Sequence, residues 1–316
     1  MGSYITRRLL IAIPSLIIVT ILISGLIRLQ PGDVVMARLS EGSYLTDEEI
    51  EEIRRDLGLH RSFPVQYAEW ISGVLRGDLG DSLWTQRDVL ETLATRSRVS
   101  VQLALMAMTV AVLAAVPLGI LSAVRQNTWM DYVARMFSIT GLSVPDFFLA
   151  TMLLYVLSVW VGWLPAFGYT PPWEDPWANV QAFIFPALIV GYRFSAISAR
   201  MTRSAMLEVL RQDYVRTARS KGLLERVIIV KHALRNALIP VVTIMGSQLS
   251  FLLGGLVIIE VVFSLPGVGT MGFEAIQVRD YPVVQGVVLF TALLFIGTNL
   301  LVDLSYAVID PRIRYS

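Results

Sequence analysis

Two short motifs in the sequence carry chemistry in other proteins, and the first suggests a serine nucleophile. The segment GDSL, residues 80–83, matches the nucleophile segment of one class of esterases. Such a serine needs a histidine base within hydrogen-bond reach. The only histidines are His60 and His232, and His232 falls in a connection that we predict on the opposite side of a membrane from Ser82. The sequence therefore argues against a hydrolase.

The second motif is a G-x-G-x-x-G pattern formed by Gly267, Gly269 and Gly272. In a dinucleotide-binding unit this pattern follows a strand and opens a helix. Here it follows a long apolar stretch, so we expect the glycines to permit a tight turn and not to hold a nucleotide. The sequence also lacks a G-x-x-x-x-G-K-[ST] phosphate-binding loop. If ATP drives this protein, another chain binds it.

Two side chains of opposite charge interrupt stretches that are otherwise apolar. Asp146 follows Pro145, where we expect a kink, and Arg193 precedes Arg203 by ten residues. At 1.5 Å rise per residue, both lie about 15 Å from the same membrane surface, where a charge costs ~3 kcal/mol or more. Two interpretations stay open: an ion pair that holds two helices in register, or a pair that lines a solute path. A titrating carboxylate in a path would also suit a stand-alone proton-coupled transporter.

The composition places the chain in a lipid bilayer. Its 316 residues are 55% hydrophobic and 16% charged, whereas soluble domains average about 25% charged. The net charge of +1 says little, because in a membrane protein the placement of charges matters more than their sum. Cysteine is absent, so we expect neither disulfides nor thiolate metal sites.

Six stretches are long and apolar enough to predict transmembrane helices. A span needs about 20 mostly apolar residues to cross about 30 Å of hydrocarbon. The stretches are 9–27, 101–124, 137–161, 183–199, 239–263 and 283–302. The first also resembles a secretory signal, but no small-residue cleavage site follows it. We therefore predict an all-α membrane protein with six transmembrane helices.

The distribution of basic residues predicts the orientation of these helices. Cytoplasmic loops carry an excess of lysine and arginine. One side of the predicted topology gathers most of them, namely Arg7, Arg8, Arg125, the segment 200–235, Arg312 and Arg314. The opposite connection 163–182 has none. We therefore predict that both termini and the segment 200–235 are cytoplasmic.

The long connection 30–98 predicts a small external helical unit. Thr46 and Glu49 form a capping box, in which each residue satisfies a free N–H group of the other at a helix start. Pro64 then opens a second helix. Its apolar residues recur at helical spacing and give one apolar face: Tyr67, Trp70, Ile71 and Val74. A helical hairpin lying on the membrane surface is the alternative.

The segment YVRTARSKGLLE, residues 214–225, is short, basic and polar between apolar stretches. We predict a two-turn helix that Asp213 caps and Gly222 ends. One side would carry Tyr214, Thr217 and Ala218. Because two of these three are small, a partner could come close to that side. A basic helix resting on anionic lipid headgroups is the alternative.

This segment resembles the cytoplasmic loop of ABC importer permeases. Their signature E-A-A-x-x-x-G reads Arg216, Thr217, Ala218 and Gly222 here. Arg216 replaces the usual glutamate, and Arg235 stands where the general pattern has proline; both departures are similar to the peptide and nickel branch of the family. Further segments along nearly the whole chain look like that branch: LGLHRSFPVQYAEWISGVLRGDLGDS, GLSVP, KHALRNALIPVV, IIEVVFSLPGVG and NLLVDLSYAVIDPRIR. The long external connection resembles the B-type subunit.

The resemblance implies a type I ABC importer permease fold in the cell membrane of a prokaryote, and a set of partners. This chain and a C-type second permease would form the path, two ATPase subunits would attach below, and an external solute-binding protein would deliver a dipeptide, an oligopeptide or a related small solute. ATP and Mg²⁺ would be bound by the ATPases. This chain would be no enzyme, and would bind no cofactor and no nucleic acid. Relatives of this branch also carry nickel chelates or oligosaccharides, so the resemblance leaves the solute open.

The resemblance also implies that the short basic helix is a coupling helix, seated in a groove of one ATPase. Its residues would be Tyr214, Arg216, Thr217, Ala218, Arg219, Lys221 and Gly222. The chain would divide into an N-terminal transmembrane helix (1–29), an external helical segment (30–98) and a five-helix permease core (99–316) with the coupling loop 204–236.

Small and polar residues predict which helices line the solute path. The fifth stretch carries Gly246, Ser247, Gln248, Ser250, Gly254 and Gly255, and the second carries Pro117 and Gly119. Such residues favour close helix contact or a wet lumen. We expect Asp146, Arg193, Ser247 and Gln248 to contribute to the path, with plain helix packing as the alternative.

Overall fold

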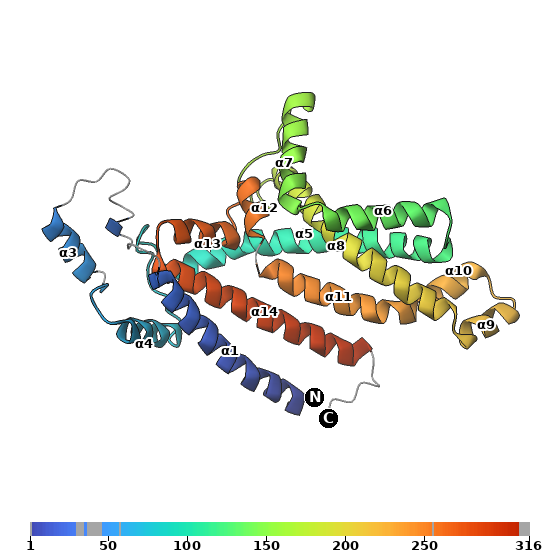
Figure 1. The fold of residues 1–316 in the computed structure, drawn as a ribbon, viewed down its shortest axis with the longest axis horizontal. Helices are drawn as coiled ribbons and strands as arrows, with labels where there is room; N and C mark the ends of the chain where they lie inside the picture. Colours follow the sequence, from blue (N-terminus) through green and yellow to red (C-terminus); the bar gives the residue numbers. More distant parts are fainter. Residues whose placement is uncertain (1, 30–34, 37–45, 57, 255, 310–316) are drawn as a thin grey trace. The chain divides into compact units, whose positions relative to one another are not determined.

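The computed structural model describes residues 2–29, 35–36, 46–56, 58–254 and 256–309, and within these ranges the chain is built of helices without a named strand (Figure 1). In chain order they are α1 (Gly2–Leu29), α3 (Asp47–Asp56), α4 (Phe63–Val74), α5 (Val89–Val124), α6 (Trp129–Ser143), α7 (Asp146–Val156), η1 (Leu157–Val161), α8 (Pro176–Leu210), α9 (Asp213–Ser220), α10 (Glu225–Val227), η2 (Ile228–Leu234), α11 (Arg235–Leu253), α12 (Val257–Val262), α13 (Val268–Gln277) and α14 (Tyr281–Ile309). The two η elements are π-helices. The predicted all-α class is confirmed.

Five helical runs in the described residues are long and apolar enough to cross a membrane. They lie in α1, α5, α8, the continuous run from α10 to α11, and α14. A sixth is added when the bent pair of α6 and α7 with η1 is counted as one span. On that count the structure agrees with the six predicted transmembrane helices.

The third predicted span, 137–161, is not one straight helix. α6 ends at Ser143, α7 begins at Asp146, and the two axes differ by 100°. Pro145 lacks the N–H that an uninterrupted helix needs, and Val144 before it is extended, with φ −93 and ψ 125. The kink predicted at Pro145 is confirmed, and at 100° it divides the predicted span into two helices.

The fifth predicted span, 239–263, ends too late. α11 stops at Leu253, and a separate helix, α12, begins at Val257. Gly254 stands at this break, and glycine is about 1 kcal/mol less favourable than alanine inside a helix. Gly255, which the sequence analysis placed in the same span, lies outside the described residues.

The fourth predicted span, 183–199, is the middle of a much longer helix. α8 has 35 residues, and Asp175 caps its start by accepting hydrogen bonds from the backbone N–H groups of Trp177 and Ala178, both at 3.0 Å. Pro176 occupies the first helical position, where its missing N–H is harmless. In its apolar window 67% of the residues are buried, so α8 is a central helix of its unit.

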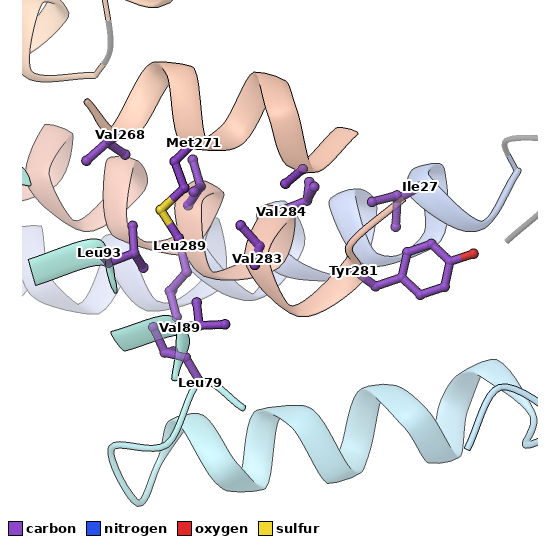
Figure 2. Close-up of a cluster of buried hydrophobic side chains, with 12 residues drawn as sticks. Ile27, Leu79, Val89, Leu93, Val268, Met271, Tyr281, Val283, Val284 and Leu289 are labelled. Atoms are coloured by element: carbon purple, nitrogen blue, oxygen red, sulfur yellow. The ribbon is translucent and has the colours of Figure 1, made fainter. Parts of the chain in front are cut away.

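The chain forms two compact units, which we describe separately. Unit 1 comprises Met1–Ser100 and Pro266–Ile296, and unit 2 comprises Val101–Leu265 and Gly297–Ser316. The core of unit 1 is a hydrophobic cluster in which Leu93 of α5 points toward Leu289 of α14 and Met271 of α13 (Figure 2). A Cβ on Gly286 would lie 2.7 Å from a methyl carbon of Val89, so glycine permits α14 to approach α5 closely here.

The helices of the long connection in unit 1 form as predicted. The backbone N–H of Thr46 donates to Glu49 at 2.7 Å, and the backbone N–H of Glu49 donates to the Thr46 hydroxyl at 3.4 Å, which confirms the capping box. The backbone N–H of Thr46 and its hydroxyl both donate to the Glu49 carboxylate and lower its pKa. Trp70 of α4 packs on the hydrophobic cluster of unit 1, and the Tyr67 hydroxyl lies 2.9 Å from that of Thr20 in α1. The apolar face predicted for the second helix is therefore directed inward.

The GDSL motif of unit 1 has a structural role. Ser82 is buried, donates to the carboxylate of Asp280, and accepts a hydrogen bond from the backbone N–H of Thr85 at 2.8 Å. Asp280 also accepts from the backbone N–H of Leu83 at 3.0 Å. The motif therefore ties the loop before α5 to the start of α14, and its hydroxyl is already engaged.

The G-x-G-x-x-G motif of unit 1 is also structural, but not as predicted. Gly267 precedes α13 in an extended conformation that any residue adopts, and Gly269 and Gly272 lie within α13, so the predicted tight turn is wrong. A Cβ on Gly272 would lie 3.0 Å from a methyl carbon of Val287. The role the structure gives Gly272 is therefore close packing of α13 on α14.

In unit 2, α6 and α11 run beside α8 (Figure 1). Glycines set how closely the helices approach. A Cβ on Gly191 of α8 would lie 2.6 Å from Val110 of α5, and one on Gly141 of α6 would lie 2.8 Å from Ala196 of α8. In unit 2, side chains of one helix thus pack against the backbone of the next. Because such packing is tight, we expect α5, α6 and α8 to move together as a rigid unit.

Candidate functional site

The predicted basic helix exists as α9, at the end of α8 that lies away from α7 (Figure 1). Gln212 occupies the N-cap position without a side-chain cap bond, and Asp213 is the first residue of the helix. The prediction that Asp213 caps the helix is therefore wrong by one position. Asp213 still lies in the first turn, where a negative charge favours the helix dipole.

The end of α9 is fixed by a glycine, as predicted. Gly222 has φ +73, a left-handed conformation that is costly for residues with a Cβ. Its N–H donates to the carbonyl of Arg219 at 2.9 Å, and the N–H of Leu223 donates to the carbonyl of Ala218 at 3.4 Å. This pair of bonds is the Schellman motif, which satisfies carbonyls at a helix end.

One face of α9 is anchored to the rest of unit 2. Val215 is fully buried and Ala218 is 8% exposed, and both pack in a cluster with Ile228 at the start of η2. Ala218 was predicted to lie with Tyr214 and Thr217 on a surface for a partner. That grouping is wrong, because Ala218 lies three residues after Val215, on the inward face.

The other face of α9 is polar and exposed. Its exposed residues are Asp213, Tyr214, Arg216, Thr217, Arg219, Ser220, Lys221 and Gly222. The Tyr214 hydroxyl accepts a hydrogen bond from Asn236 at 2.8 Å, and Arg219 pairs with Glu225 at 2.7 Å. These bonds tie the exposed face to the following helices, and no histidine or cysteine lies on it. The arrangement suits docking and not catalysis.

The two charges predicted inside the spans meet. Arg193 of α8 donates through Nη1 to Oδ2 of Asp146, the first residue of α7, at 3.0 Å. The Arg193 side chain is 48% exposed and that of Asp146 is 18% exposed. The other carboxylate oxygen of Asp146 is buried without a protein partner. The ion-pair interpretation is therefore confirmed as a contact.

The two polar residues predicted for the path in the fifth span point in different directions. Gln248 is buried and accepts a hydrogen bond from Ser198 of α8 at 3.0 Å, whereas Ser247 is exposed and donates to the carbonyl of Thr243 at 3.3 Å. Neither is hydrogen-bonded to Asp146 or Arg193. Gln248 thus joins α11 to α8, which is the packing alternative.

The small residues of the second and fifth spans also serve packing. A Cβ on Gly246 of α11 would lie 2.5 Å from Val302 of α14, and one on Gly119 of α5 would lie 2.5 Å from Thr202 of α8. Pro117 and Gly246 line an apolar cavity of about 750 Å³ between α5, α11 and α14. The cavity is lined by apolar side chains, and Thr298 is the one polar side chain in its lining that could contact a peptide.

Sequence reasoning missed the most completely bonded charge in unit 2. Asp131 of α6 is fully buried and accepts two hydrogen bonds from Arg203 of α8, at 2.9 and 3.0 Å. It also accepts from Arg135 at 2.9 Å, from Ser122 at 2.5 Å and from the backbone N–H of Asn127 at 3.0 Å. The i, i+4 spacing of Asp131 and Arg135 was visible in the sequence, but Arg203 lies 72 residues away.

Two family models match the chain. The first, described as a binding-protein-dependent transport system inner membrane component, matches residues 115–315 and so includes α9. The second, described as the N-terminal part of such a membrane component, matches residues 1–104.

Similar proteins match over full length. A glutathione transport system permease protein of Pectobacterium atrosepticum is 43% identical over 315 residues, and a dipeptide transport system permease protein of Alkalihalophilus pseudofirmus is 41% identical over 336 residues; each comparison covers 100% of both chains. Among solved structures, a chain of an inward-facing methionine ABC transporter has a TM-score of 0.54 at 19% identity, covering 70% of this chain and 97% of that one. The last likeness is one of fold.

Proposed function

We propose that this chain is a membrane subunit of a peptide importer. It belongs to the family of binding-protein-dependent transport system inner membrane components. The chain is a multi-pass membrane permease subunit of an ABC importer and not an enzyme. Its solute is a short peptide of the dipeptide or glutathione class. This class is supported by full-length relatives that are named as permeases for those solutes.

The permease works with partners that supply what this chain lacks. A C-type second permease completes the path, two ATPase subunits bind ATP and Mg²⁺, and an external solute-binding protein delivers the peptide. Both termini and α9 face the cytoplasm of a prokaryotic cell. The gathering of arginines on one side of the predicted topology supports this orientation.

One observation supports the proposal: one face of α9 is buried against unit 2, and the other face is exposed. Val215 and Ala218 fix its inner face, Gly222 fixes its end, and its polar outer face is open to a partner. A helix anchored in this way transmits displacement instead of absorbing it. Only Arg211 and Gln212 separate α9 from α8, so a push on α9 by a closing ATPase is passed directly to the central helix of unit 2.

The motion of α8 reaches the charges inside the membrane. Arg193 lies on α8, and its partner Asp146 begins α7 directly after the bend at Pro145. We assign this pair to the edge of the solute path, where opposite charges can meet the charged ends of a peptide. The alternative of a stand-alone proton-coupled transporter is set aside, because the family of this chain is one of ABC importer permeases.

The test compares two strained glycine substitutions in the reconstituted complex. Gly222 and Gly168 both have positive φ, at +73 and +91, and a Cβ on either would meet no atom within 4 Å. Val at either position strains only the backbone, by about 1–2 kcal/mol. In proteoliposomes, Gly222→Val is expected to lower peptide uptake and to uncouple ATP hydrolysis from peptide addition, whereas Gly168→Val leaves both unchanged. Equal effects of the two substitutions would overturn the coupling role of α9.

A further inference from the structure

A cavity of about 330 Å³ lies in unit 2 among α5, α6 and α8, apart from the contacts described for transport. Its lining is unusually rich in arginine for a cavity among membrane-spanning helices. The side chains that matter are Arg135, Arg200, Arg203, Ser122, Ser138 and Ile139. Ser122 lies near the end of α5 and Arg203 within the last turns of α8, so the cavity is at the α9 end of these helices.

The charges around this cavity do not balance. Three guanidinium groups line it, and in the described part of the chain Asp131 is the one carboxylate that pairs with any of them, namely with Arg135 and Arg203; Arg200 is exposed. Both oxygens of Asp131 are already engaged, by five hydrogen bonds in all. Three positive charges and one negative leave an excess of two. Positive charge at membrane depth is costly unless an anion or water neutralises or solvates it.

Several guanidinium N–H groups at the cavity also lack a hydrogen-bond acceptor among the described residues. The Nε of Arg135 is buried and has no hydrogen-bond partner among the residues that the structure describes. The side chain of Arg200 makes no hydrogen bond or ion pair with any residue that the structure describes. Arg203 uses Nε and Nη2 for Asp131, which leaves its third nitrogen. Guanidinium groups present paired N–H donors that match the oxygens of a phosphate group.

The surroundings of the cavity are those of a lipid-facing surface. On α6, Trp129 is 69% exposed and Tyr132 is 56% exposed, and aromatic residues of this kind gather at the headgroup level of a bilayer. One to two turns further along α6, Met136 and Ile139 are exposed and apolar. Ile139 also lines the cavity. Along α6, aromatic side chains come first, then basic ones, then apolar ones. A phospholipid presents matching groups in the same order, from its headgroup to its acyl chains.

We propose that this cavity binds the phosphate of an anionic phospholipid from the leaflet on the α9 side of the membrane. Arg135, Arg200 and Arg203 hold the phosphate oxygens, and the acyl chain follows Ile139 along α6. Basic pockets between membrane helices bind anionic headgroups by the same chemistry. The site is independent of the coupling role of α9, because it uses no residue of that helix.

The experiment uses the whole importer complex, purified in mild detergent and examined by native mass spectrometry with added phosphatidylglycerol or phosphatidylcholine. Arg200→Gln is the informative variant, because Arg200 has no hydrogen-bond or ion-pair partner to lose among the residues that the structure describes. We expect the variant to lose about tenfold in apparent affinity for phosphatidylglycerol, Arg200→Lys to lose less, and phosphatidylcholine to bind equally weakly to all. Arg125→Gln, an exposed arginine in the connection before α6, is the matched control and should retain the lipid.

Three outcomes would overturn the proposal. Equal phosphatidylglycerol retention by the wild type and Arg200→Gln would show that the cavity is no lipid site. Binding of inorganic phosphate by the lipid-free complex, as tight as that of the lipid and lost in Arg200→Gln, would assign the site to a free anion. Dissociation of the second permease from Arg200→Gln without any change in lipid count would likewise replace the lipid by an acidic side chain of that subunit.

Discussion

Arg193 of α8 lies 3.0 Å from Asp146, the residue at which α7 starts after the 100° bend. The pair therefore joins the central helix of unit 2 to the far side of a proline break. The pair links α7 to α8 across a break where Pro145 has no N–H to continue the helical hydrogen bonds of α6 into α7.

Neutralising one partner of this pair should harm more than neutralising both. Asp146→Asn or Arg193→Gln leaves one charge without its partner, and we expect a loss of about 1–2 kcal/mol in the stability of the purified chain, reduced by the exposure of Arg193. Asp146→Asn with Arg193→Gln should recover most of this loss. The measurement is thermal unfolding of the detergent-solubilised complex. It is compared among the four proteins of a double-mutant cycle, namely the wild type, the two single variants and the double variant.

The same four variants separate the structural role of the pair from its place in the path. If the charges meet the ends of a peptide, uptake in the double variant stays low although its stability recovers. Full recovery of uptake together with stability would instead confine the pair to holding α7 against α8, and would contradict our placement of it at the path.

Ala218 and Thr217 are neighbours on α9 with opposite orientations, so a bulky side chain at each has a different effect. Ala218→Trp must displace α9 from Ile228 and Leu210, which pack against its inward face, and we expect this to cost about 1–3 kcal/mol. Limited proteolysis should then cleave the connection around α9 faster. Thr217→Trp adds bulk on the exposed face and should leave proteolysis unchanged while weakening association with the ATPase. Identical protease sensitivity of the two variants would argue against the inward orientation of Ala218.

Asp131 should be among the most sensitive residues of unit 2. Asp131→Asn removes the charge that Arg203 and Arg135 share, and breaking one side of a buried ion pair costs about 3–5 kcal/mol. Glu174→Gln is the matched control, since that carboxylate is exposed in the connection before α8. We expect a large fall in the yield of folded complex for the first variant and none for the second. A normal yield of Asp131→Asn would mean that the arginines find water or lipid as substitutes.

Acid should loosen the start of α3. Hydrogen bonds from Thr46 hold the pKa of Glu49 below its ordinary value of 4.5. A carboxyl group with a lowered folded-state pKa contributes stability that is present above the unfolded-state pKa and is lost as pH falls through the folded-state pKa. Amide exchange at residues 46–50, corrected for its intrinsic pH dependence, should therefore show less protection below about pH 4 than near neutrality. In Thr46→Val this additional pH dependence should become smaller without disappearing, because the hydroxyl is lost while the backbone N–H of residue 46 still donates to Glu49.

The sequence predicted helices well because their signals are local. The capping box of Thr46 and Glu49, the kink at Pro145 and the glycine end at Gly222 each depend on a few adjacent residues, and each is present in the structure. Hydropathy found the spans but misjudged the fifth, because apolar residues continue past Gly254 into α12.

Relationships between distant segments were harder to predict. Ala218 was placed on the outer side of α9, because the pattern alone does not reveal that Val215 and Ala218 pack together on Ile228 beneath the helix. Asp131 was overlooked, since its main partner, Arg203, comes from a helix that follows two intervening elements. The Asp146 and Arg193 pair was foreseen only because unpaired charges are so costly in apolar stretches that opposite signs at equal depth suggest a meeting.

The most direct test of the account is whether the exposed face of α9 touches an ATPase subunit. The natural chain has no cysteine, so a single cysteine can be placed at Thr217, on the exposed face, or at Thr128, exposed in the connection between α5 and α6. After treatment of the membrane complex with a short thiol-to-amine reagent, the Thr217→Cys chain is predicted to form an adduct with the ATPase and the Thr128→Cys chain none. An adduct from Thr128→Cys, with none from Thr217→Cys in an intact complex, would contradict the assignment of α9 as the coupling helix.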